Sequence, residues 1–244
     1  MKECSKSISR RMRDPNFINK YFVGTGLDIG GLPDPLAIYQ ELFCQMGSVR
    51  TWDWDDGDAQ HLKSIGNSEL DFVHSSHCLE HLVDPFVGLE NWLRVTRPGG
   101  YIIVTVPDED LYEQGEWPPT FNKDHKTSFT IQKKSSWCDK SINVFDLLTS
   151  LGDAVDIIKI ELLNSNYRYN LPRYDQTLTP IAECGIEFII RKRENGETGV
   201  VSLREPDMEV AENMRIHLNQ YKDDMDTMKN SNSGKLPFTN KSDL

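Results

Sequence analysis

Three short segments of this 244-residue chain hold residue types that could bind a ligand or support catalysis. In the first, Gly26-Leu-Asp-Ile-Gly-Gly31, apolar residues alternate around Asp28, which predicts a strand that ends in two glycines. Backbone without side chains lets a ligand approach closely. Pro33 and Asp34 then open a predicted helix, whose N-terminus could receive an anionic group. The turn does not identify its ligand, because it lacks the third glycine of a dinucleotide fingerprint and the Lys-Ser/Thr of a phosphate loop.

The second segment is acidic and follows the strand predicted over Val49 to Trp54. Asp53 lies close to the roughly 20-residue spacing after Gly30 at which an acidic residue can accept both hydroxyls of a ribose. A solvated turn is the alternative explanation of this acidic cluster, which also holds Asp55, Asp56 and Asp58.

The third segment, His77-Cys-Leu-Glu80-His81, matches the His-x-x-Glu-His pattern of one metallopeptidase group. We interpret it otherwise, because it begins at the end of a predicted strand and no distant third ligand stands out. Glu80 and His81 would then fix the following helix or the neighbouring ligand loop. The run Asp108-Glu-Asp110 is an alternative site for a divalent cation. Our expectation is that the chain holds no metal.

These segments need a scaffold, which the sequence provides as a strand, a helix and a second strand. Leu70 to Val73 predicts a buried strand, Asp84 to Thr96 an amphipathic helix with Asp84 as N-cap, and Tyr101 to Val106 another buried strand. This βαβ unit requires a parallel sheet, and ligands bind beyond the carboxyl ends of such strands. The residues expected at the first strand's end are Ser75, Ser76 and His77.

Further elements complete an α/β domain. The sequence predicts helices over 36–46 and 141–151, the latter with Ser141 as N-cap, and strands over 155–163 and 185–191.

The expected organisation has three parts. Residues 1–22 form an N-terminal arm or helix packed on the domain, and residues 23–193 form the domain itself. Two insertions, at about 107–140 and 164–180, are expected to lie over the site. Residues 194–244 form a polar extension, helical within 207–229 and disordered from 230.

Composition excludes several classes of protein. The net charge of −11 disfavours nucleic acid as a partner, because phosphates would be repelled. No apolar run reaches the roughly 20 residues of a membrane span, and the first residues lack an apolar signal region. Five irregularly spaced cysteines fit a reducing cytoplasm better than a disulfide framework. The sequence does not exclude an oligomer.

The ordered motifs over residues 24–107 resemble those of class I S-adenosylmethionine-dependent methyltransferases. The matching segments are Leu27-Asp-Ile-Gly-Gly, Asp53, Asp58-Ala59, Asp71-Phe-Val-His-Ser-Ser-His-Cys-Leu-Glu-His, Arg94-Val-Thr-Arg-Pro-Gly-Gly and Val104-Thr-Val-Pro. The resemblance implies a Rossmann-like, seven-stranded, mostly parallel sheet of order 3-2-1-4-5-7-6 with helices on both faces.

The resemblance also implies a cofactor, S-adenosyl-L-methionine, and the residues that would bind it. Asp28, Gly30 and Gly31 would line its methionine part, and Asp53 would hold the ribose hydroxyls. The remaining contacts would come from Asp58 and Ala59 at the adenine and from Ser75, Ser76 and His77 at the sulfonium. The chain departs from the usual Gly-x-Gly, which is Gly30-Gly31-Leu32 here, and its second crossover is short.

The stretch Leu111 to Thr130 and the run Asp175-Gln-Thr177 resemble a subgroup associated with bacterial surface-saccharide biosynthesis. This implies a sugar or phosphorylated small molecule as acceptor, and favours O-methylation of a sugar hydroxyl over N-methylation of a small amine. A hydroxyl gains from a general base, for which His125 is the candidate, with Asp124 orienting it or binding the acceptor. The expected walls of the acceptor pocket are Tyr112, Trp117, Tyr167 and Tyr169.

Two other functions stay open at this point. One is a cofactor-binding module without catalysis, and the other is a dehydrogenase on a related nucleotide-binding sheet. The intact glycine and acidic positions favour a methyltransferase over both.

Overall fold

The computed structural model describes residues 3–131, 133–194, 196 and 224–230. The chain divides into two compact units, Met1–Gly199 and Val200–Leu244. In the second unit residues 224–230 are helical. The helix predicted within 207–229 and the disordered end predicted from 230 lie mostly outside the described residues.

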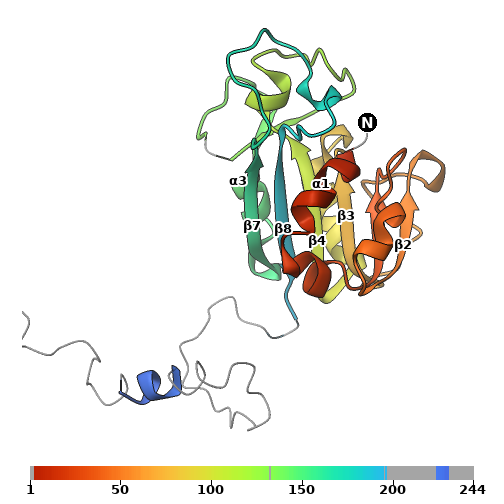
Figure 1. Cartoon of the computed structure of the whole chain (residues 1–244). Coiled ribbons are helices and arrows are strands. Elements are labelled where there is room, and N and C mark those ends of the chain that lie inside the picture. The colour runs from red at the N-terminus through yellow and green to blue at the C-terminus, as the bar shows by residue number, and fades with distance from the viewer. Residues whose placement is uncertain (1–2, 132, 195, 197–223, 231–244) are drawn as a thin grey trace, which may run out of the picture. The chain divides into compact units, whose positions relative to one another are not determined.

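The first unit is built on a six-stranded sheet of order β2-β1-β3-β4-β8-β7 (Figure 1). Neighbouring strands are parallel except β8, which is antiparallel to both β4 and β7. The strands are β1 (Gly24–Ile29), β2 (Met46–Trp52), β3 (Leu70–Ser76), β4 (Thr96–Pro107), β7 (Val155–Leu163) and β8 (Gly185–Lys192). This confirms the Rossmann-like α/β prediction.

The sheet has six strands in the described part of the chain, where the resemblance implied seven. The seventh strand would follow β2 in the sequence and pair with it at the edge of the sheet. The described residues form no strand there. Between Trp52 and Leu70 the chain forms only turns and the short 3₁₀ helix η3 (Trp54–Asp56). So few residues, rich in Asp and Gly, cannot form both a crossover helix and a strand.

Helices cover both faces of the sheet. In Figure 1, α1 (Glu3–Arg11) crosses one face, while α2 (Pro85–Val95) and α3 (Val144–Thr149) lie on the other. On the α1 side, Phe17 and Phe22 pack with strand residues such as Phe72. On the other side the core contains Leu89 and Trp92 of α2 and Leu147 and Leu148 of α3. The Asp84 carboxylate caps α2, as predicted, by accepting from the backbone N–H groups of Phe86 and Val87.

Two predicted helices are shorter than expected. The helix over 36–46 is a 3₁₀ helix, η2 (Leu36–Leu42), whose Ile38 and Leu42 remain exposed, and β2 already begins at Met46. The helix over 141–151 is limited to α3 and its N-cap is Asn143 instead of Ser141, because residues Ser141–Asn143 pair as β6 with β5 (Ser128–Thr130). In both places strand pairing prevails over local helix propensity.

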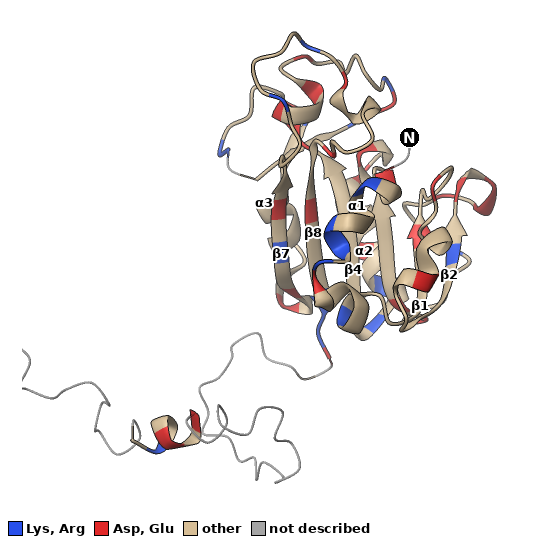
Figure 2. Cartoon of the chain, viewed as in Figure 1, with Lys and Arg blue, Asp and Glu red and all other residues tan. Residues whose placement is uncertain are grey.

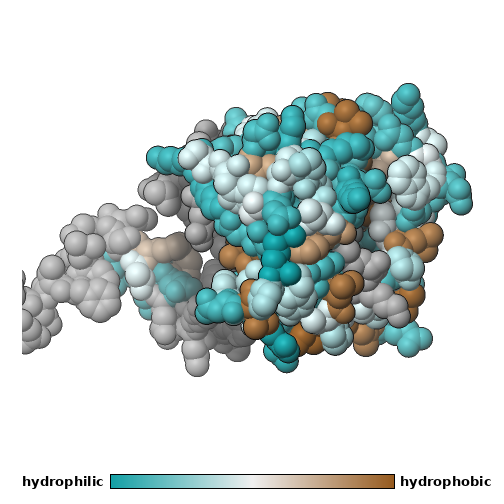
Figure 3. All heavy atoms as spheres, turned by 90° about the horizontal axis from the view of Figure 1, so that it is seen from above, coloured by the Kyte–Doolittle hydropathy of each residue, from teal (hydrophilic) through white to brown (hydrophobic). Residues whose placement is uncertain are grey.

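Segments 107–140 and 164–184 lie beyond the strand ends at one end of the sheet (Figure 1). Seen from above, polar and apolar residues are intermixed over this end (Figure 3). The short helical turns in the first unit are η1 (Phe17–Tyr21), η4 (Leu79–His81), η5 (Glu109–Glu113), η6 (Gly152–Ala154) and η7 (Gln176–Leu178). No helix among the described residues is both long and apolar enough to cross a membrane.

Candidate active site

A pocket of about 230 Å³ lies where β1 and β3 end beneath the loops. The glycine turn after β1, the end of β3, the helix α1 and the 107–140 insertion all contribute to its wall. Its lining residues are Glu3, Cys4, Asp28, Gly30, Gly31, Leu32, Asp34, His74, Ser76, His77, His81, Asn122 and His125. Five of the predicted cofactor residues and the predicted base therefore face one cavity.

The glycine turn has room for backbone only. Gly30 has φ of +71°, and a Cβ there would lie 2.8 Å from Cys78 Cβ. A Cβ on Gly31 would lie 2.3 Å from the Asp28 Oδ2 atom. Both positions therefore require glycine, and the backbone of the turn remains open to a ligand.

Replacing Gly31 with alanine is expected to abolish measurable cofactor binding, because the new methyl group would displace the Asp28 carboxylate from the pocket wall. Calorimetric titration with S-adenosylhomocysteine would measure this. Gly115→Ala is the matched control: a Cβ at Gly115 meets nothing within 4 Å, although its φ of +84° adds local strain. Equal affinity in the two variants would contradict the assignment of the turn.

Asp28 is held in a fixed position below the turn. Its side chain is 1% exposed, Oδ2 accepts from the backbone N–H of Leu36 at 2.6 Å, and Oδ1 lies 2.6 Å from His74 Nδ1. The other ring nitrogen of His74 lies 2.9 Å from Arg11 Nη1. Since a guanidinium can only donate, His74 Nε2 accepts and its Nδ1–H donates to Asp28. Burial, with Arg11 adding to it, lowers the pKa of His74 although Asp28 opposes the shift.

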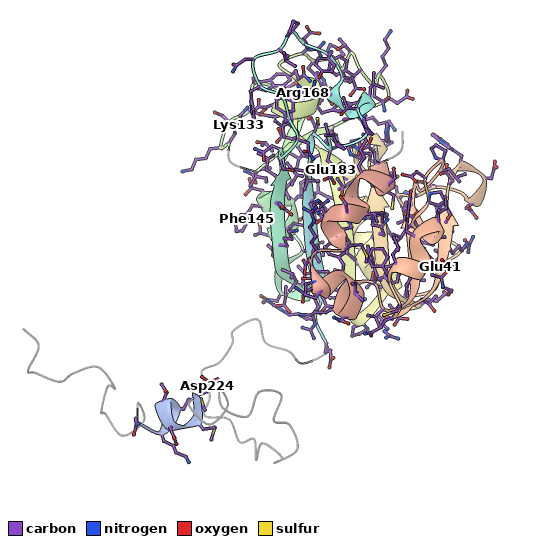
Figure 4. All side chains as sticks on the ribbon, in the orientation of Figure 1. Glu41, Lys133, Phe145, Arg168, Glu183 and Asp224 are labelled. Atoms are coloured by element: carbon purple, nitrogen blue, oxygen red, sulfur yellow. The ribbon has the colours of Figure 1, made fainter. Side chains whose placement is uncertain are left out.

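The same chain of contacts attaches α1 to the sheet. Arg11 and Glu187 of β8 are both fully buried, with Nη2 and Oε2 3.0 Å apart. Arg10 bridges Glu187 and Glu183, each at 2.7 Å. Burial alone would raise the pKa of Glu187, yet Arg11 and Arg10 lower it to about 2. Figure 2 shows the basic residues on α1 and the acidic residues on β8, and Figure 4 labels Glu183, which precedes β8. This pairing holds α1 where Glu3 and Cys4 line the pocket.

Three imidazoles placed around a buried carboxylate form another part of the wall. Glu80 of η4 is fully buried, and its Oε1 lies 3.4 Å from His77 Nδ1, 3.8 Å from His125 Nε2 and 3.9 Å from His81 Nε2. Neither oxygen of Glu80 has a hydrogen-bond partner among the described residues. Burial alone would raise the pKa of Glu80, but His77 and the other two imidazoles lower it.

His125 is oriented by Glu113, a residue that the sequence did not single out. His125 Nδ1 lies 2.8 Å from Glu113 Oε1, and both side chains are buried. The exposed Asp124, predicted to orient His125, instead accepts from His81 Nδ1 through its backbone carbonyl at 3.3 Å. With its Nδ1 held by Glu113, His125 directs Nε2 towards Glu80 and the pocket.

The remaining predicted cofactor residues lie outside the pocket wall. Asp53 is adjacent, because its Oδ2 accepts from the Leu32 backbone N–H at 3.1 Å, while Oδ1 caps η3. Ser75 is buried and donates to the Ile29 carbonyl at 3.1 Å. Asp58 is exposed, and Ala59 packs against the core with its carbonyl bound to the Trp92 indole N–H.

One of the four predicted acceptor-binding aromatics packs beside the pocket, behind His125. Tyr112 is 1% exposed and its ring lies 5.2 Å from that of His125. Trp117 and Tyr167 are half-buried away from the pocket. Tyr169 is 57% exposed and stacks edge-on against Tyr167 at 4.8 Å.

At residues 108–110, the alternative cation site, the three carboxylates already bind backbone N–H groups or a lysine. The Asp108 carboxylate caps η5 by accepting from two backbone N–H groups, and burial raises its pKa to about 6. Lys133 Nζ lies 2.7 Å from Glu109 and 2.6 Å from Asp110. Lys133 and Arg168 lie in the two loop segments above the sheet (Figure 4).

Several pocket residues were absent from the sequence prediction. Glu3 and Cys4 belong to a helix far away in sequence, and His74 was hidden inside an apolar strand. Glu113 falls within the predicted insertion, where carboxylates are common. Only His74 could have been noticed in the sequence, because it is a polar residue within an apolar strand.

Part of this domain matches a known protein family. Residues 33–104 match the family model described as "Methyltransferase domain". A search of curated proteins finds no match. The matched segment includes η2, β2, β3, α2 and most of β4.

Solved structures with a similar fold include several methyltransferases. A methyltransferase of Archaeoglobus fulgidus is 19% identical (76% of this chain, 94% of that chain, TM-score 0.42). One of Methanosarcina mazei is 13% identical (69% and 92%, TM-score 0.41). A chain of the Haloferax volcanii complex that contains the Trm112 methyltransferase activator is 10% identical (79% and 90%, TM-score 0.45). These low scores carry no argument about the reaction.

The strand order, the glycine turn after β1 and the family match agree. Residues 33–104 thus match a methyltransferase domain, within a sheet of Rossmann-like strand order.

Proposed function

We propose that this protein transfers the methyl group of S-adenosylmethionine to a hydroxyl of a small sugar or phosphorylated saccharide, in the biosynthesis of a surface polysaccharide. The observation that carries the proposal is one pocket that joins the Gly30-Gly31 turn to His81 and His125, both of which lie beside the buried Glu80.

The pocket fits the methionine end of the cofactor. The backbone of Gly30 and Gly31 is open, and Ser76 and His77 line the same cavity at the end of β3. A volume of about 230 Å³ is below the roughly 300–1,000 Å³ of most small-molecule pockets, so the adenosyl part would extend over the adjacent surface. Asp53, whose Oδ2 accepts from the Leu32 backbone N–H, is the residue that we propose for the ribose hydroxyls. When bound, the cofactor supplies the electrophilic methyl group.

The protein then has to position the acceptor and remove its proton. Tyr112 and Asn122 border His125, whose Nε2 lone pair could accept the hydroxyl proton. Holding the two reactants in line supplies much of the rate enhancement. The predominantly polar lining suits a small polar acceptor. The five cysteines are free, which supports the proposal of a reducing cytoplasm as the compartment.

Two measurements test this proposal. Calorimetry with S-adenosylmethionine and S-adenosylhomocysteine is expected to give one site per chain. A panel of nucleotide sugars, sugar phosphates and small amines, assayed for S-adenosylhomocysteine release, is expected to turn over with a sugar hydroxyl. Tight binding of NAD instead would favour a dehydrogenase.

N-methylation of a small amine is the second candidate, since an amine needs no base once it is neutral. Turnover only with amines would favour it. Cofactor binding without turnover on the panel would favour a non-catalytic binding module.

A further inference from the structure

We propose that Glu80, His81 and His125 bind one divalent first-row transition ion at the edge of the methyl-transfer pocket. The ligands would be one oxygen of Glu80 and the Nε2 atoms of both histidines. The role of the ion in catalysis rests on the proposed function, whereas its binding does not.

The geometry is close to that of a metal site. The three ligand atoms all lie within 4.8 Å of one another. Glu80 Oε1 is 3.8 Å from His125 Nε2 and 3.9 Å from His81 Nε2. Tetrahedral zinc, with bonds of about 2.0–2.1 Å, separates its ligands by about 3.4 Å. Coordination would shorten the two Glu80–histidine separations by about 0.5 Å and the distance between the two histidine nitrogens by at most about 1.4 Å, which side-chain rotations can supply.

The state of Glu80 provides an independent indication of a ligand. Its side chain is fully buried, yet neither oxygen accepts a hydrogen bond among the described residues. Burying a carboxylate without such partners is costly, and buried charges are normally paired or bound to a metal. An ion at this position would satisfy the carboxylate.

Both histidines are also oriented as metal ligands usually are. His125 donates its Nδ1–H to Glu113 Oε1 at 2.8 Å, and His81 donates its Nδ1–H to the Asp124 carbonyl at 3.3 Å. Ligating histidines almost always donate their second N–H to a carboxylate or a carbonyl, which fixes the tautomer. Here both Nε2 atoms lie on the side of Glu80, at 3.9 Å for His81 and 3.8 Å for His125.

This site differs from the metallopeptidase arrangement that the sequence pattern suggested. His77 lies outside η4 with φ of +55°, so His77 and His81 do not share a helical face. The second histidine is His125 from the insertion, which the sequence offered no means of pairing with Glu80.

The ligand set favours zinc, iron, cobalt or manganese over magnesium or calcium, because two of the three ligands are imidazoles. His81 and His125 both line the pocket, so the open coordination positions of the ion would face the acceptor. The ion lowers the pKa of a bound water to about 7. With the ion bound, His125 Nε2 would be a ligand, so the resulting hydroxide would replace it as the base. The hydroxide, formed by release of one proton to solvent, would take the acceptor's proton and become water. The acceptor oxygen would then form its bond to the methyl carbon as the carbon–sulfur bond breaks, leaving its electron pair on sulfur.

The test is metal binding by the full-length chain, first stripped with a chelator. Calorimetry with Zn²⁺ and the visible absorption of added Co²⁺ are expected to show one ion per chain. Glu80→Gln, His81→Ala and His125→Ala are each expected to weaken binding at least about 10-fold. His61→Ala is the matched control, because His61 is exposed and outside the cluster. Millimolar Mg²⁺ is not expected to compete.

The outcomes are separable from those of the proposed function. Absence of a stoichiometric Zn²⁺ or Co²⁺ site in the wild-type chain would overturn the inference, as would equal affinity in the three variants and the control. Circular dichroism would show that the variants are folded. S-adenosylhomocysteine titration of the same samples reports on the proposed function alone, so either proposal can fail while the other stands.

Discussion

Replacing His125 with alanine is expected to lower kcat for methyl transfer to a hydroxyl acceptor by about 10²- to 10⁴-fold. The affinity for S-adenosylhomocysteine is expected to change little, because His125 lies beyond the glycine turn on the opposite wall of the pocket. The physical reason is that the acceptor oxygen is a poor nucleophile until its proton leaves. Removing the imidazole removes either the base itself or a ligand of the ion that would hold the base.

Steady-state kinetics with the acceptor identified from the panel would measure this effect. Glu113→Gln is a graded companion, since an amide oxygen can still accept from His125 Nδ1 while the negative charge is lost. A smaller decrease in kcat is expected for it than for His125→Ala. Full activity of His125→Ala would remove His125 from the reaction and favour an amine acceptor.

Replacing Arg11 with methionine is expected to lower the free energy of unfolding by about 3–5 kcal/mol, because it leaves Glu187 charged and buried without its main partner. The melting temperature would fall by roughly 6–20 °C. Arg50→Met is the matched control, since Arg50 and Asp56 form a pair with the arginine 56% exposed, and about 1 kcal/mol or less is expected there. Urea unfolding of both variants would measure the difference.

The same ion pair predicts how wild-type stability depends on pH. The pKa of Glu187 is about 2 in the folded chain and near its usual 4.5 when unfolded. Its contribution is therefore fully present above about pH 4.5 and is lost as pH falls towards 2. In Arg11→Met this acid-dependent loss should be smaller. Parallel pH dependence in variant and wild type would contradict the assignment.

The fold was predictable because its signals are local. An apolar strand, an Asp84-capped helix and a glycine turn each depend on neighbouring residues in sequence, and β7 is found where its run of β-branched residues predicted it. The two shortened helices were not predictable, because pairing and exposure elsewhere determined them. The β5–β6 pair, for example, takes Ser141–Asn143 out of the predicted helix. The missing strand, by contrast, follows from the short segment between Trp52 and Leu70, which the sequence shows directly.

The cofactor side of the site was more predictable than its catalytic side. The turn after β1 has no space for a side chain at Gly30 or Gly31, and a sequence motif shows such a requirement directly as glycine. The hydrogen-bond partner of His125 depends on how the insertion folds. The sequence predicted its neighbour Asp124, but Glu113 forms the hydrogen bond. The role of α1 was likewise hidden, because Arg11 and Glu187 are 176 positions apart.

That separation sets an order of events during synthesis on the ribosome. The docking of α1 requires its carboxylate partner on β8, which leaves the exit tunnel long after the glycine turn has been made. Until then, the basic end of α1 has no buried counter-charge, and one side of the cavity is open. Nascent chains released before β8 would thus have most of the methyltransferase motifs but lack a closed cavity around them.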